Sequence, residues 1–538
     1  MDFEDVLEDV GAWGRFQKCL LAFYGFSVSM VASIPGMVLL FMVMVPDHSC
    51  HIPELANVTR KDTIPFQPSE SDASCRIHVV NNSSTEEMTC IYGWQYDKTY
   101  FDDTAATKWN MVCDDSHYPS LLLTLQNVGS LIGGTIYGAL ADRFGRKLLC
   151  FGLLLLSSIT DLASVFANSF IIFCILRAIN GSVLPTMYNL PYILISEFMA
   201  PEKRVLVNVV FNSGWMTGMC ILPLAAYLTR SWVLLGIFSS ICTASVLLFW
   251  KYVPESASWL VSQDRYSDAT NVMMLIGKRN GKNIEEKTLS MKLKNTKEEE
   301  AKEDKSFFSF MLKHPRLRKH FLILTFSWTA NTLAYLGFQY NVVHLAGNVF
   351  VNYFLLSLVE APGNALFWYS MEKIGRRWSA TIGFFTIALC CLLPLSGVEY
   401  SDVASSIIGK LITSGLFMNV DQQGCELFPT VARSLGVGTG KSISMIIVLF
   451  TPFVAYLSNY GKIIPFLIIG SVCLLASVLS SFLPETLSKN LPQSYSDAEN
   501  FGLDQEYFSF NRKKKPVPEA TVYAIEVKDP NIIYSIRL

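Results

Sequence analysis

The stretch Gly138-Ala-Leu-Ala-Asp142-Arg143-Phe-Gly145-Arg146-Lys147 lies between two apolar runs of membrane-spanning length, residues 118–137 and 148–167. A turn this rich in charge between two such runs has to lie in water at the face of a bilayer. The second half of the chain repeats the pattern in a weaker form, Met371-Glu372-Lys373-Ile374-Gly375-Arg376-Arg377, again directly after an apolar run. One copy in each half predicts that the chain is built as an internal repeat.

The composition of the chain is that of a membrane protein. Of its 538 residues, 51% are hydrophobic and 16% are charged, and the mean hydropathy is +0.34. Soluble proteins carry about 25% charged residues, so this chain is too apolar for that class. The net charge of −2 does not indicate a nucleic-acid partner. About twelve apolar runs are long enough to span a bilayer, which predicts an all-α polytopic membrane protein with two six-helix bundles.

The apolar runs and the polar segments between them divide the chain into seven parts. In chain order we expect an N-terminal segment, a first membrane helix, a long loop, the rest of the first bundle, a linker, the second bundle and a tail: 1–17, 18–45, 46–117, 118–253, 254–319, 320–483 and 484–538. A cleaved signal peptide would begin with basic residues, whereas the first segment is acidic. We therefore expect the first helix to be retained.

The long loop has the features of an extracellular segment. Acidic residues outnumber basic ones in it, and it contains three acceptor triplets for N-linked glycans, at Asn57, Asn81 and Asn82. It also contains four cysteines, which we expect to be disulfide-bonded in one of three possible pairings: Cys50, Cys75, Cys90 and Cys113. Glycans and disulfides both form on the oxidising side of a membrane.

The linker has the opposite charge bias, because lysine and arginine are concentrated between residues 278 and 319. The positive-inside rule places such a segment in the cytosol, and we expect both termini there and the protein in the plasma membrane. The tail contains Arg512-Lys513-Lys514-Lys515-Pro516, which is typical of a disordered end near anionic lipid. Its last residues, Ile536-Arg537-Leu538, make a cytosolic tail-binding protein a possible partner.

The charged turn of residues 138–147 resembles the loop between the second and third helices of the major facilitator superfamily of secondary transporters. Further motifs, from the first helix to the last, resemble the organic cation, anion and zwitterion transporters of solute carrier family 22. They include Pro46-Asp47-His48-Ser-Cys50, Gly93-Trp94-Gln-Tyr96-Asp97, Lys108-Trp109-Asn-Met-Val112-Cys113 and Leu483-Pro484-Glu485-Thr486. The resemblance implies two bundles that rock about a central site and open it to either side in turn, with no cofactor and no bound metal.

The resemblance also implies a charged latch on the cytosolic face of each bundle. In the first half its residues are Asp142, Arg143, Arg146, Glu197, Arg204 and Glu255, and in the second half Glu372, Arg376, Arg377, Glu426, Arg433 and Glu485. Two motifs depart from the family's pattern. Ala257-Ser258 stands where the family has Pro-Arg, and Glu372 stands where it has Asp. The alternative is that these residues only set topology and cap helices. Their mixed signs favour the latch, because the positive-inside rule gives acidic residues little role.

Ionisable side chains within an apolar run are costly and mark candidate functional sites. Glu360 is one, at a position where the resembled transporters also carry a glutamate, and Asp421 is another. Met445 occupies the position of the family's charge selector, which is Arg in anion and carnitine-type members and Asp in classical cation members. Lys441 lies one turn earlier, where it either meets a substrate carboxylate or extends to the bilayer surface. For both acids the alternative is a structural hydrogen bond to a neighbouring helix.

Polar and aromatic residues recur at helical spacing in three further runs. We expect them to line the substrate site, and the alternative is that they form packing faces between helices: Trp328, Asn331, Tyr335 and Gln339 in one run, Asn212 and Trp215 in another, and Tyr188 and Tyr192 in a third. Aromatic rings near buried carboxylates suit a cation, because the face of each ring attracts positive charge.

Two acids, the aromatic residues and the lack of an arginine at the selector position favour a transporter of small organic cations or amine-bearing zwitterions. An organic-anion transporter is the first alternative and rests on Lys441; a receptor or accessory subunit that keeps the fold but does not transport is the second. The watery segments contain no H-E-x-x-H, P-loop or nucleophile-elbow pattern, so we do not expect an enzyme. The expected partners are a small organic ion and the lipid bilayer.

Overall fold

The computed structural model describes most of the chain. The described residues are 3–11, 13–51, 66–68, 74–81, 84–90, 92–200, 203–282, 285–296, 314–429, 433–487, 489, 492, 495–503 and 505. The predicted glycosylation sites Asn57 and Asn82 and the basic and terminal parts of the tail lie outside them, and Asn81 is the last residue of a strand.

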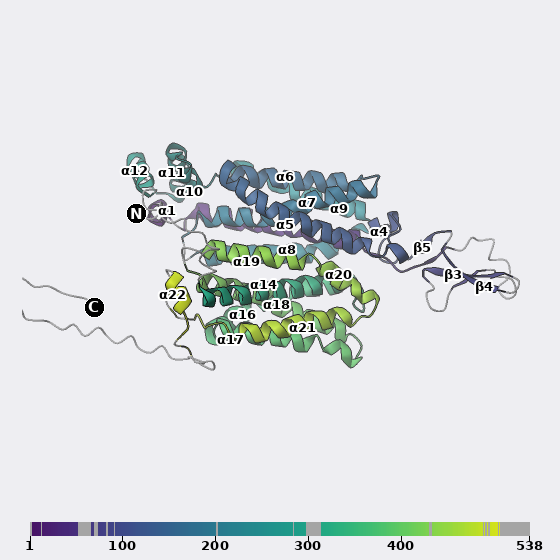
Figure 1. The fold of residues 1–538 in the computed structure, drawn as a ribbon. Helices are drawn as coiled ribbons and strands as arrows, with labels where there is room; N and C mark the ends of the chain where they lie inside the picture. The colour runs from purple at the N-terminus through teal and green to yellow at the C-terminus, as the bar shows by residue number, and fades with distance from the viewer. Residues whose placement is uncertain are drawn as a thin grey trace, which may run out of the picture.

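Long helices run side by side in two halves, which Figure 1 shows one above the other. The N-terminal half contains Arg15–Met42 (α2, η1 and α3), Tyr118–Phe144 (α5), Arg146–Val165 (α6), Phe170–Ser196 (α7), Arg204–Thr229 (α8) and Trp232–Lys251 (α9 and η5). The C-terminal half contains Pro315–Tyr340 (α14), Val349–Leu358 (α15), Glu360–Lys373 (α16), Arg376–Cys390 (α17), Ser401–Leu427 (α18), Arg433–Val448 (α19), Thr451–Tyr456 (α20) and Ile464–Ser480 (α21). Ten spans among the described residues are long and apolar enough to cross a membrane, and α5 and α21 lie alongside them. The expected all-α fold of two six-helix bundles is confirmed.

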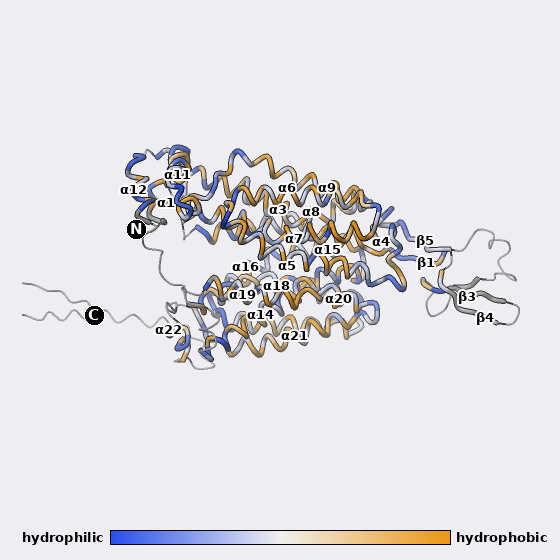
Figure 2. The backbone as a smooth tube through the Cα atoms, turned by 45° about the horizontal axis from the view of Figure 1, so that its top comes forward, coloured by the Kyte–Doolittle hydropathy of each residue, from blue (hydrophilic) through white to orange (hydrophobic). Residues whose placement is uncertain are grey.

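Polar elements cover both ends of the helices, as the blue segments of Figure 2 show. One end, here called the linker side, carries Phe3–Val10 (α1), Ala257–Ser262 (α10), Tyr266–Asn280 (α11), Glu286–Thr296 (α12) and Tyr495–Asn500 (α22). The opposite end, the loop side, carries a four-residue helix, Ala105–Lys108 (α4), and two small antiparallel sheets. Water-exposed segments thus lie at the two faces that a membrane would leave uncovered.

The loop between the first two long helices is organised by strands and disulfides. Its sheets pair His48–Cys50 (β1) with Trp94–Tyr96 (β5), and Phe66–Pro68 (β2) with Arg76–Asn81 (β3) and Ser84–Thr89 (β4). The predicted disulfides are present, as Cys50–Cys90 and Cys75–Cys113. The sequence leaves three pairings open, and the chain path through the sheets selects this one.

Two glycines allow α5 and α7 to pack closely. A Cβ atom at Gly129 would lie 2.1 Å from the carbonyl oxygen of Ala178, and one at Gly133 would lie 2.0 Å from that of Ser182. Any side chain at these positions would therefore force the two helices apart.

The two halves contact each other from the loop side to the middle of the helices. Near the loop side, the rings of Tyr227 in α8 and Phe350 in α15 lie 5.5 Å apart. Deeper along α8, the indole nitrogen of Trp215 donates a hydrogen bond to the hydroxyl of Tyr335 in α14, at 3.3 Å. The contacts therefore close the loop-side end of the interface between the halves.

Candidate functional site

The charged turn of the N-terminal half is held by Glu255, which precedes α10. The carboxylate of Glu255 accepts hydrogen bonds from the backbone amides of Arg146 and Lys147, each at 3.0 Å, and so caps the first turn of α6. Gly145 in this turn has a φ of +101°, and a Cβ atom there would lie 2.6 Å from a Glu255 carboxylate oxygen. Glycine is required for both reasons, because other residues rarely adopt this φ and their Cβ would collide with the capping group.

Arg146 connects this turn to the end of α7. Its guanidinium lies 3.2 Å from the carboxylate of Glu197 and 3.5 Å from that of Asp142. Burial raises the pKa of the Glu197 carboxyl above its usual value, and the charge of Arg146 acts against that rise. The Asp142 side chain is 76% exposed, so its contact with Arg146 contributes little.

The C-terminal half repeats this arrangement. Glu485 accepts hydrogen bonds from the backbone amides of Arg376 and Arg377, at 2.8 and 3.2 Å, at the start of α17. Gly375 has a φ of +98°. The guanidinium of Arg376 lies 3.3 Å from Glu426 and 3.6 Å from Glu372. The repeat predicted from two short motifs is therefore visible as matching geometry at matching positions.

The remaining predicted latch residues lie apart from these ion pairs. Arg143 is exposed and its guanidinium lies 5.6 Å from the ring centre of Phe144, and Arg204 is exposed at the start of α8. Two side-chain nitrogens of Arg433 are buried without a hydrogen-bond partner among the described residues. Each ion pair described above joins residues of one half, and within the described part of the chain none bridges the two halves on the linker side.

The two acidic caps give a prediction. Glu255→Ala and Glu485→Ala are each expected to lower stability by about 1–2 kcal/mol, because the amides at the start of α6 or α17 lose their acceptor. The check is the midpoint of thermal unfolding of each purified variant. Asp142→Asn is the control and should change the midpoint little, because its side chain is exposed. A loss at Asp142 as large as at Glu255 would contradict the capping role.

Glu360 lies in the middle of the membrane-spanning region with a cation beside it. The Nζ atom of Lys410 in α18 lies 3.3 Å from its carboxylate, and the two side chains are 0% and 7% exposed. The hydroxyl of Tyr335 donates a 2.8 Å hydrogen bond to the same carboxylate. This hydroxyl also accepts the hydrogen bond from Trp215 of the N-terminal half. The Glu360 carboxylate is therefore paired with a cation and buried between the helices.

Asp421 is also paired, but its pair is exposed. Its carboxylate lies 2.8 Å from the Nζ atom of Lys441 and accepts a 2.8 Å hydrogen bond from the indole nitrogen of Trp328. The side chains of Asp421 and Lys441 are 40% and 47% exposed. Lys441 belongs to α19, which packs against α5 of the N-terminal half, so the pair includes a residue of a helix at the interface between the halves.

The two predicted tyrosines of α7 pack against aromatic rings of α8. The ring of Tyr188 lies 5.4 Å from that of Trp215, and the ring of Tyr192 lies 5.4 Å from that of Phe211. The remaining predicted residues differ in burial. Asn331 and Gln339 are buried in α14, Asn212 donates a hydrogen bond to Asn208 along α8, and Met445 is half-buried in α19.

Lys410 is not among the site residues predicted from the sequence. It lies within an apolar run, as Glu360 does, and the rule that marks intramembrane charges would have identified it. A second buried pair, Arg177 with Asp161, lies entirely within the N-terminal half, where the guanidinium is 3.0 Å from the carboxylate. Ser239 donates a 2.7 Å hydrogen bond to the same carboxylate. This pair joins α6, α7 and α9 and does not reach the interface between the halves.

Comparison with known proteins agrees with this architecture. The family model described as "Sugar (and other) transporter" matches residues 76–495. The chain is 30% identical to "Organic cation transporter 1" of Caenorhabditis elegans, over 98% of this chain and 92% of that one. It is 28% identical to the "Beta-alanine transporter" of Drosophila melanogaster, over 93% of this chain and 89% of that one.

Among solved structures, the inward open conformation of the xylose transporter XylE from E. coli matches with a TM-score of 0.60. The match covers 90% of this chain and 99% of XylE at 14% sequence identity, so it supports the fold alone. The family model covers most of the chain, and the relatives align over almost all of it. The chain therefore belongs to the sugar (and other) transporter family of the major facilitator superfamily, among the organic cation, anion and zwitterion transporters of solute carrier family 22, and it is a multi-pass membrane transporter.

Proposed function

We propose that this transporter carries small amine-bearing zwitterions, and small organic cations less well, by alternating access across the plasma membrane. The observation that carries the proposal is that both intramembrane acids at the interface between the halves have a lysine partner. Unpaired acids would attract a cation, whereas a carboxylate beside an ammonium group offers complementary partners to a molecule that bears both charges.

Asp421 and Lys441 are the proposed contact groups for the substrate. Their side chains are exposed, so a ligand can reach them, and the buried Trp328 fixes the Asp421 carboxylate through the hydrogen bond from its indole nitrogen. A zwitterion can replace both partners of this ion pair, because its amine can contact Asp421 and its carboxylate can contact Lys441. A cation satisfies Asp421 but leaves Lys441 without its partner, which makes the exchange less favourable.

An organic anion is the weaker candidate. Both lysines near the interface already contact a carboxylate, so an anion would have to displace an acidic side chain and leave it unpaired. The relative from Drosophila named as a beta-alanine transporter supports the zwitterion, since beta-alanine carries one amine and one carboxylate.

We propose that the loop side faces the cell exterior and that the linker side and both termini lie in the cytosol. The acceptor triplets, the disulfides and the acidic balance support the exterior assignment of the loop, and the basic linker supports the cytosolic one. The described contacts between the halves lie between the loop side and the middle of the helices. The exposed Asp421–Lys441 pair lies nearer the linker side. This arrangement supports a site open towards the cytosol.

The proposal predicts how uptake depends on membrane voltage. Uptake of a net-neutral zwitterion moved alone is expected to be insensitive to voltage, whereas a cation gains about 2.3 kcal/mol of driving force per 100 mV. The measurement is uptake of radiolabelled beta-alanine, its amide as a matched cation and its N-acetyl derivative as a matched anion, in cells clamped at several potentials. Preferred uptake of the N-acetyl anion would overturn the proposal, as would preferred, voltage-driven uptake of the amide.

A further inference from the structure

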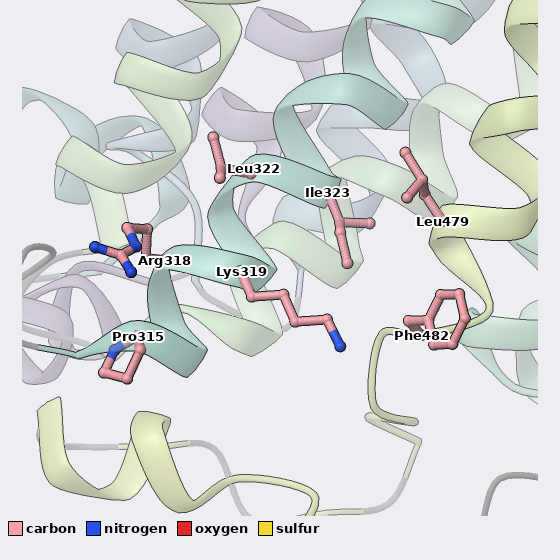
Figure 3. A pocket seen from close by; sticks show the side chains of 7 residues that line it. All are labelled: Pro315, Arg318, Lys319, Leu322, Ile323, Leu479 and Phe482. Atoms are coloured by element: carbon pink, nitrogen blue, oxygen red, sulfur yellow. The ribbon is translucent and has the colours of Figure 1, made fainter.

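A groove on the membrane-facing side of the C-terminal half lies at the linker-side ends of α14 and α21. It encloses about 510 Å³ and is lined by Pro315, Arg318, Lys319, Leu322, Ile323, Leu479 and Phe482 (Figure 3). Its lining residues belong to none of the ion pairs described above. The groove is therefore separate from the proposed substrate site.

The lining divides into a charged end and an apolar end. Arg318 and Lys319 lie in the second turn of α14 and are both exposed, close to the linker-side end of the helix. Leu322, one turn further into the membrane-spanning region, is 60% exposed, and Phe482, which lies just after the end of α21, is 49% exposed. Figure 3 shows the side chain of Lys319 extending towards Phe482, and its Nζ atom lies 5.3 Å from the ring centre.

The nearby acidic residue is already engaged. Glu499 in α22 accepts hydrogen bonds from the backbone amides of Arg316 and Leu317, at 3.0 and 2.9 Å, and so caps the start of α14. Arg318 and Lys319 are absent from the ion pairs that the described residues form. The charged end of the groove thus carries two cations next to a helix start that is already neutralised.

We propose that this groove binds one anionic phospholipid of the linker-side leaflet. The headgroup phosphate contacts Arg318 and Lys319, and an acyl chain lies against Leu322 and Phe482. An anionic phospholipid has a charged headgroup and an apolar acyl chain. Two cations at the level of the headgroups, next to exposed apolar side chains, match these two parts of the lipid. The basic stretch of the tail is a poor occupant, because its charge has the same sign as the groove.

The experiment compares the full-length protein in nanodiscs of phosphatidylcholine alone and of phosphatidylcholine mixed with phosphatidylserine. Phosphatidylserine is expected to raise the thermal unfolding midpoint and to remain bound after exchange into detergent, where native mass spectrometry counts it. The double variant Arg318→Ala/Lys319→Ala should bind it about thirtyfold more weakly, since each cation near a membrane surface contributes about a factor of five. Arg318→Lys should retain binding, because it keeps the charge.

Lys373→Ala is the matched control. Lys373 lies 5.9 Å from the ring centre of Tyr369 at the same face, but it does not line the groove. Loss of phosphatidylserine binding in this variant to the same extent would show a diffuse surface effect and overturn the proposal. So would unchanged binding in the double variant. Inorganic phosphate is the second probe, and a shift of the unfolding midpoint by phosphate equal to that of the lipid would assign the groove to a soluble anion instead.

Discussion

Lys410→Met is expected to destabilise the protein by about 3–5 kcal/mol, the largest loss that we predict for a single substitution. The variant leaves the Glu360 carboxylate buried without its cation, next to Tyr335 in the middle of the membrane-spanning region. The loss of stability comes from the buried, uncompensated charge of Glu360 and not from the loss of the ion-pair contact itself. The measurement is the midpoint of thermal unfolding of the purified variant.

A double variant separates stability from transport. Lys410→Met/Glu360→Gln removes both charges, so stability is expected to recover, because a neutral pair of similar size replaces a buried ion pair at little cost. Transport of this double variant is expected to be lower than that of the unmodified protein, since the removed ion pair lies beside Tyr335, which bonds to Trp215 across the interface between the halves.

The buried pair of the N-terminal half is the matched control for this experiment. Arg177→Met/Asp161→Asn removes an ion pair of comparable burial that joins helices of one half only. This variant should recover stability and also keep transport. If the Lys410/Glu360 double variant transported as well as the Arg177/Asp161 one, the interface pair would be a structural element alone.

Lys441→Met is expected to lower zwitterion uptake about tenfold to a hundredfold, which corresponds to about 1.4–2.8 kcal/mol. The substrate carboxylate loses its partner, while Asp421 loses its own cation and becomes available to a cationic substrate. Uptake of the matched cation should therefore rise or stay unchanged. The measurement is the ratio of zwitterion to cation uptake in the variant and in the unmodified protein.

Asp421→Asn completes this test. This variant should lower uptake of both the zwitterion and the matched cation, because the substrate amine loses the Asp421 carboxylate as its partner. Uptake of the matched anion should fall less. Lys373→Met, which removes an exposed lysine of α16 at the linker side, is the control for a general effect of lost charge. An equal loss of all three substrate classes in Lys441→Met would show that the pair stabilises the helices and does not select the substrate.

The candidate site could be predicted from the sequence only in part. Glu360 and Asp421 are recognisable because a carboxylate inside an apolar run is rare. Their partners are not recognisable from spacing. Lys410 lies on a different helix from Glu360, and Lys441 on a different helix from Asp421, so each pair depends on which helix faces which. The sequence predicts small organic cations or amine-bearing zwitterions as substrates, and we propose that the lysine partners favour the zwitterion.

The sequence by itself determined the class of protein, the two halves and the two charged turns. Hydropathy over about twenty residues is a local property, and a turn such as Gly145-Arg146 is specified by residues next to each other in the chain. Only the tertiary structure decided the pairing Cys50–Cys90 and Cys75–Cys113, the lysine partners of the two acids, and the groove between α14 and α21. Each of these joins residues far apart in the chain, and their distances are set by how the helices and strands pack, which no local pattern encodes.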